Sequence, residues 1–206
     1  MKDRQTGSVW THYDGSVLQG PLTDSGIKLE VQPLVHTTWS EWSSIHPDTL
    51  VPEWETEFVH QYRDVSPGGG GVGPAFQRSL LHTDDRLPDA ALVLGAGVGT
   101  EFRAYVLDDF AGLTVVEDEL GGHPIVVFLD PDASFGLAYS SAVDGTALAL
   151  RVEDGHIVDG ERTVWDATGR AVEGPRAGAQ LQFVTSFVTE WYGWVAYYPA
   201  TSIYGR

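Results

Sequence analysis

The segment WSEWSSIHPDT at residues 39–49 recurs near the other end of the chain as WYGWVAYYPAT at residues 191–201. Both copies place two tryptophans three residues apart and follow them with a proline and a threonine at the same spacing. The shared positions predict a structural element that the chain contains twice. The positions that differ, His46 and Asp48, are tyrosine and alanine in the second copy, so any role beyond folding is expected at these two residues.

The repeat extends well beyond this phrase. The stretch GSVWTHYDGSVLQGPLTDSGIKL at 7–29 aligns with ERTVWDATGRAVEGPRAGAQL at 161–181, and tryptophan, glycine and proline match in the same order. These residue types constrain side-chain volume and backbone torsion together, so the match predicts an internal structural repeat.

Each copy is predicted to contain short strands around a glycine turn, a proline-containing loop, a further strand and a short helix. In the first copy, Thr38 and Glu41 have the spacing of a capping box at the helix start, and Pro47 ends the helix. Trp39 and Trp42 lie on one face of this helix, which we expect to point into the core together with its counterpart in the second copy.

The composition favours a β-rich fold, since 24 glycines and 11 prolines suit short strands joined by tight turns better than long helices. Between residues 91 and 165, apolar segments alternate with turn sequences, among them Gly99-Thr100, Gly121-Gly122, Asp144-Gly145 and Asp154-Gly155. We therefore predict an α+β fold that is predominantly β, with an antiparallel barrel-like or sandwich sheet and short tryptophan-bearing helices.

Three regions are expected within one compact domain. Residues 1–51 hold the first copy of the repeat, residues 52–90 form a connector rich in glycine and proline, and residues 91–206 hold the second copy with the strands before it. The first region is predicted to pack on the third.

The charge balance excludes some partners. The chain has 29 acidic and 12 basic residues and a net charge of -17, which repels phosphate backbones and argues against nucleic-acid binding. It has no cysteine, and no apolar run is long enough to span a membrane. The first residues do not read as a targeting segment, so we expect a soluble protein, extracytoplasmic only if a leader was removed.

The assembled pieces resemble the bacterial and archaeal family known as domain of unknown function 3179. The resemblance rests on DRQTGSVW, HTTWSEWSSIHPDTLV, EFRAYVL, EDELGGHPIVVFLDP and TVWDATGRAVEGPRAGAQL, together with the second double-tryptophan segment, and it covers nearly the whole chain. It implies two tandem units, each with a front half and a back half. On this comparison the chain holds the back half of the first unit and all of the second, so Met1 falls in mid-domain and a truncated or split chain is expected.

The resemblance also implies which chemistry is absent. Members often carry a His-Glu pair and a Cys-Pro-Leu-Cys motif in the first front half, a set suited to metal or redox chemistry. The equivalent places in the second unit here hold Leu113-Thr114 and Asp130-Pro131-Asp132. The resemblance therefore implies a fold rather than an activity.

Several residues remain candidates for a site. Trp39, Trp42, His46 and Asp48 are candidates for ligand binding, and His12, His36 and His46 are candidates for a divalent metal site with a nearby carboxylate. The alternative for each histidine is a turn cap or a packing partner of a tryptophan. The carboxylates of 117–119 are interpreted as a solvated turn. The glycine run of 67–73 lacks the lysine and serine or threonine that follow a phosphate loop, and the run of 94–99 leads into a strand-like segment and not into a helix.

We interpret the chain as a non-catalytic binding or assembly module and do not expect it to be an enzyme by itself. Its partner would be a second copy or another chain that covers the incomplete first unit. Two alternatives stay open, a metal- or redox-dependent enzyme whose catalytic half lies elsewhere, and a protein that binds carbohydrate or another small ligand on its tryptophans.

Overall fold

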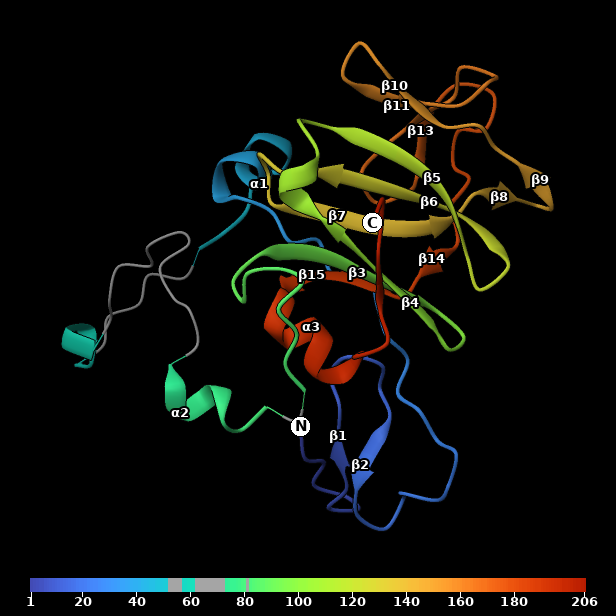
Figure 1. The fold of residues 1–206 in the computed structure, drawn as a ribbon. Coiled ribbons are helices and arrows are strands. Elements are labelled where there is room, and N and C mark those ends of the chain that lie inside the picture. The colour runs from blue at the N-terminus through green and yellow to red at the C-terminus, as the bar shows by residue number, and fades with distance from the viewer. Residues whose placement is uncertain (52–56, 62–72, 81) are drawn as a thin grey trace. The chain divides into compact units, whose positions relative to one another are not determined.

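The computed structural model describes residues 1–51, 57–61, 73–80 and 82–206. These residues form two compact units, Met1–Leu34 and Val35–Arg206. Figure 1 shows the elements of both units along the chain.

The smaller unit is built on one hairpin, in which β1 (Val9–Trp10) pairs antiparallel with β2 (Val17–Gln19). Before the hairpin, the Asp3 carboxylate accepts bonds from the Thr6 backbone N–H at 2.6 Å and from the Trp10 indole N–H at 2.8 Å. These bonds, that from the Thr6 backbone first, hold the pKa of Asp3 well below its ordinary value. The turn thereby fixes the indole over the hairpin.

In its described residues, the larger unit contains three four-stranded sheets and a two-stranded ribbon. The first sheet has the order β15 (Ser186–Glu190), β3 (Leu92–Val98), β4 (Glu101–Val106) and β16 (Ser202–Ile203). The second has the order β14 (Phe183–Val184), β7 (Phe135–Ser140), β6 (His123–Asp130) and β5 (Thr114–Leu120). The third has the order β10 (Arg151–Glu153), β11 (His156–Val158), β12 (Val164–Trp165) and β13 (Ala171–Glu173), and the ribbon pairs β8 (Ala142–Val143) with β9 (Thr146–Ala147).

The helices of the described residues are short. They are α1 (Trp39–Ile45), α2 (Pro74–Gln77) and α3 (Trp191–Tyr197), with 3-10 turns η1 (Val59–Gln61) and η2 (Leu107–Asp109).

The second sheet lies between the other two (Figure 1). Its strand β6 carries an apolar run at residues 125–129, and the side chains of this run are buried on both faces of the sheet. Val127 faces one core with Leu94 of the first sheet, and its neighbour Phe128 faces the other core with Trp165 of the third sheet. Side chains that alternate across a strand thus supply two cores.

The structure confirms the predicted fold class. The chain is predominantly β with short helices, and within the described residues the strand pairs are antiparallel except the parallel pair of β4 with β16. Hairpin turns lie at the glycines that predicted them, for example at Gly99 and Gly121. Within the described ranges the strands form stacked open sheets, as in a sandwich, and not a closed barrel.

The two copies of the repeat have the same local hydrogen bonds. The Gly15 carbonyl accepts from the Leu29 backbone N–H at 2.9 Å, and the Gly169 carbonyl accepts from Leu181 at 2.8 Å. The hairpin β12–β13 also repeats the register shift between valine and tryptophan that occurs in β1–β2. Matching sequence has therefore produced matching backbone geometry.

The chain passes from the second sheet to the first just before α3. The Thr185 carbonyl accepts from the Gly97 backbone N–H at 2.9 Å, and the Ser186 hydroxyl accepts from the Ala138 N–H at the same distance. These bonds hold β15 against both sheets, and β15 leads directly into α3. The helix is thus seated by the strand that precedes it.

Candidate functional site

The first double-tryptophan segment forms a helix as predicted. The Thr38 hydroxyl caps α1 by accepting from the Glu41 backbone N–H at 3.2 Å, and the helix ends at Ile45, before Pro47. The last residue of the turn, His46, has left the helical region, with φ -125° and ψ 68°. Capping at one end and proline at the other therefore define this short helix.

The second segment has nearly the same backbone torsion angles at both ends of its helix. The residue before α3, Glu190, has φ -76° and ψ 148°, against -76° and 154° for Thr38, and Tyr198 ends the helix with φ -125° and ψ 65°. In both copies the second indole N–H donates to the threonine hydroxyl seven residues on, at 2.9 Å. The shared Trp-Pro-Thr positions are thus explained by local structure.

The surroundings of the two helices differ. Trp191 of α3 is 0% exposed and Trp39 of α1 is 58% exposed. Downstream, Ile203 is 6% exposed, whereas its counterpart Val51 is 67% exposed. The prediction that both tryptophan faces point into a core is confirmed for α3 and wrong for α1.

The sheet explains this difference. Helix α3 lies against β3, where the Trp194 ring fills the space above Gly95, and the strands on either side of α3 pair with β3 and β4. In the first copy, the extended residues 31–38 before α1 belong to no strand. Among the described residues, α1 is therefore not preceded by a paired strand as α3 is.

The sequence difference between the copies preserves an aromatic contact. The ring of His46 lies 4.2 Å from that of Trp42, and the ring of Tyr198 lies 4.4 Å from that of Trp194. His46 therefore packs on its tryptophan as Tyr198 does. Asp48, the other candidate, is exposed on the turn after α1.

The candidate metal ligands are engaged in separate places. The ring of His12 lies 4.7 Å from that of Tyr13, and His36 Nδ1 lies 2.8 Å from the Ser134 carbonyl oxygen. Among the residues that the structure describes, no three or more histidine, aspartate or glutamate side chains come together as a metal-binding group. The metal hypothesis gains no support from this part of the chain.

The comparisons with known proteins identify a family. The family model described as a protein of unknown function (DUF3179) matches residues 1–201. The chain belongs to this family. No curated protein and no solved structure gave a significant match to this DUF3179 chain.

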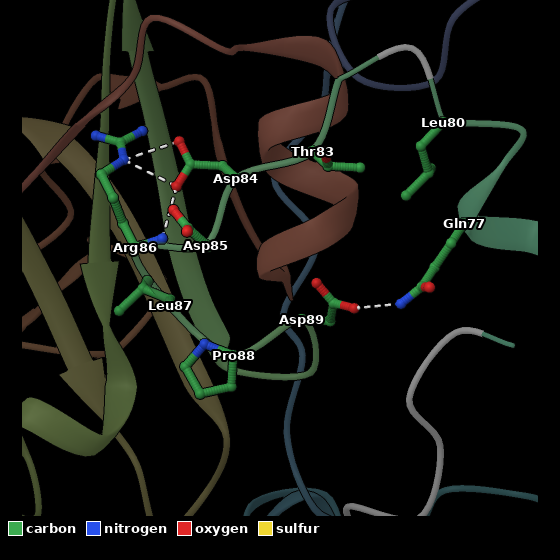
Figure 2. A pocket seen from close by; sticks show the side chains of 9 residues that line it. All are labelled: Gln77, Leu80, Thr83, Asp84, Asp85, Arg86, Leu87, Pro88 and Asp89. Atoms are coloured by element: carbon green, nitrogen blue, oxygen red, sulfur yellow. Dashed lines mark hydrogen bonds and ion pairs between the residues drawn. The ribbon is translucent and has the colours of Figure 1, made fainter. Parts of the chain in front are cut away.

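A loop of this DUF3179 protein borders a hollow of about 890 Å³, which Figure 2 shows from close by. Arg86 donates to the Asp84 carboxylate at 2.8 Å and thereby holds the pKa of Asp84 below its ordinary value. Arg86 also lies over the Trp191 ring, 5.2 Å from its centroid, and donates to the Thr201 carbonyl at 3.0 Å. The loop therefore contacts α3 and the residues after it through Arg86, which belongs to no strand of the sheet.

A second polar group joins β4 to β5. Arg103 donates to the Asp118 carboxylate at 2.5 Å, and the buried Tyr105 hydroxyl donates to it at 2.6 Å. Burial and the bond to Asp118 raise the pKa of Tyr105 above its ordinary value. The interpretation of 117–119 as a solvated turn is therefore wrong, because these residues belong to β5 and Asp118 points to the neighbouring sheet. Alternation along a strand was the signal that would have separated Asp118 from its neighbours.

Some predictions concern residues that the structure describes only in part. Residues 52–56, 62–72 and 81 of the connector lie outside the described residues, and with them most of the glycine run 67–73, and the division into three regions stays a prediction. The second glycine run, 94–99, belongs to β3 and its turn. Over the ranges that are described, the family member has no helix with the length and apolar character needed to cross a bilayer.

Proposed function

We propose that this protein is a binding and assembly module that docks a protein partner on the surface formed by residues 35–51. The exposed apolar side chains of this surface are Trp39, Ile45, Leu50 and Val51. Large apolar side chains that are exposed so close together in the sequence are typical of an interaction surface. The observation that carries the proposal is internal to the chain, since the same motif with the same geometry is buried in α3 and open in α1.

The 35–51 surface is anchored well enough to act as a platform. Val35 packs against the core between the second and third sheets, and His36 is bonded to the turn between β6 and β7. The Trp42 side chain is fixed by its bond to Thr49 and by the His46 ring. A pre-organised aromatic surface binds with a smaller loss of conformational entropy.

This proposal predicts that the protein by itself associates through the open face. We expect concentration-dependent self-association in sedimentation equilibrium, and strong fluorescence of an added anilinonaphthalene dye. The double substitution Trp39→Ser with Ile45→Ser should remove most of both signals. Val172→Ser is the matched control, because Val172 is 54% exposed on β13 and does not belong to the 35–51 surface, so its loss should change neither signal.

Unchanged dye fluorescence and unchanged association in the double variant would contradict the proposal. Circular dichroism should show that both variants keep the wild-type fold, because the substituted side chains are exposed and surface changes cost little stability.

A further inference from the structure

We infer that the partner element that occupies the 35–51 surface is a β-hairpin of the β3–β4 kind, with a glycine under Trp42, an aromatic ring against His46 and an arginine over Trp39. The inference rests on the proposed function and names the chemistry of the partner. It follows from the contacts that the second copy of the motif makes with the β3–β4 hairpin and with Arg86.

In the second copy, the strands on either side of α3 pair with both edges of the β3–β4 hairpin. Strand β15 pairs with β3 through five residue pairs, from Ser186 with Ala96 to Glu190 with Leu92. Strand β16 pairs in parallel with β4 at Arg103 and Ala104. The helix between these strands lies over the hairpin, as Figure 1 shows for α3, β3 and β4. In the first copy, the counterparts of the two strands are residues 34–38 and 50–51, and neither is in a strand.

Three side-chain contacts define what the motif recognises. The Trp194 ring occupies the space that a Cβ atom at position 95 would need. The Tyr198 ring stacks on Phe102 with centroids 4.0 Å apart and planes 23° apart. The third contact is the guanidinium of Arg86, which lies over Trp191 and bonds to the Thr201 carbonyl.

The first copy of the motif, which is open, has aromatic rings at the same three positions. Trp42, His46 and Trp39 correspond to Trp194, Tyr198 and Trp191, with nearly identical torsions at both ends of the helix. A hairpin docked here would add strands to 34–38 and 50–51, which is the geometry of β-augmentation.

The charge of the 35–51 surface fits an arginine on the partner. Residues 35–51 contain Glu41 and Asp48 and no lysine or arginine. An arginine over the exposed Trp39 ring would therefore gain a cation–π contact on a surface of net negative charge, without meeting a like charge.

The hairpin of a second copy of this chain is a poor occupant. Both edges of its β3–β4 hairpin are already paired, one with β15 and the other with β16. A second copy would have to release its own α3, whose tryptophans are buried. The occupant is therefore a hairpin of this chemistry on another polypeptide segment.

The test uses a synthetic peptide with the sequence of residues 84–106, which carries Arg86, Gly95 and Phe102 and has no tryptophan. Added to the full chain, it should shift the tryptophan emission to the blue in a saturable manner, because Trp39 and Trp42 become buried. Binding should be lost in the protein variant Trp42→Ala and with the peptide variant G95L, and should weaken at least several-fold with R86A. The protein variant V172S should bind like the wild type.

An isolated hairpin is only marginally stable, so a second form of the probe is needed. The same 23-residue segment, counted from residue 84 to residue 106, is joined ahead of Met1 by a flexible glycine-serine linker, which raises its effective concentration to the order of millimolar. Acrylamide should then quench Trp39 less in this fusion than in its G95L version.

The inference is overturned if the free peptide does not bind and the fusion gives no protection, or if the G95L forms act like the originals. If the probes fail while the wild type still associates through Trp39 and Ile45, the proposed docking function stands and a second copy is the occupant. If both the probes and self-association fail, the proposed function falls as well.

Discussion

Replacing Trp191 by alanine is expected to lower the free energy of unfolding by about 3–5 kcal/mol, which is the usual cost of removing a buried tryptophan. The equivalent change at Trp39 should cost less than about 0.5 kcal/mol, as is typical of exposed positions. The two residues hold the same place in the same motif, but Trp191 is fully buried and Trp39 is not. Urea unfolding followed by circular dichroism measures both changes.

The pair of variants compares the same motif position in a buried and in an exposed environment. If Trp191→Ala does not fold, Trp191→Phe removes less volume and still reports a loss larger than that of Trp39→Phe. Equal losses in the free energy of unfolding at the two positions would contradict the account, because they would mean that α1 is packed against another part of the protein in solution, as α3 is packed on β3.

The second large effect is expected at Gly95. Alanine at this position places its Cβ inside the Trp194 ring, and the neighbouring atoms belong to an aromatic side chain that is itself buried. Overpacking of this kind costs about 1–3 kcal/mol, and we expect the upper end because the ring cannot rotate away without losing its bond to Thr201.

Gly160→Ala is the matched control for this substitution. No atom lies within 4 Å of the Cβ that would be added at Gly160, and its backbone does not need a positive φ. Its free energy of unfolding should therefore stay within about 0.5 kcal/mol of the wild type. A Gly95→Ala variant as stable as the control would show that the indole is not seated on the glycine.

Much of the fold follows from the sequence. Glycine pairs at 121–122 and Asp-Gly at 144–145 marked hairpin turns because few other residues tolerate their backbone torsions. The capped helix at 39–45 was predictable from Thr38 and Pro47 because both act through local backbone geometry. The repeat was visible in the sequence because tryptophan constrains side-chain volume, and glycine and proline constrain backbone torsion.

The environment of those elements was not predictable. Whether Trp39 is buried depends on a sheet being present under the helix, and a local pattern carries no information about a distant strand. The contact of Arg103 with Asp118 was missed for the same reason, since it joins two sheets through residues 15 positions apart. The role of His46 emerged only when its ring contact could be compared with that of Tyr198.

Amide hydrogen exchange of the free protein tests the central claim most directly, namely that the chain carries two copies of one motif, one filled and one open. Opening free energies differ between exposed and packed helices, so the amides of 42–46 in α1 should exchange within minutes while those of 194–198 in α3 exchange only on global unfolding. Equal and strong protection of the two segments would contradict the claim.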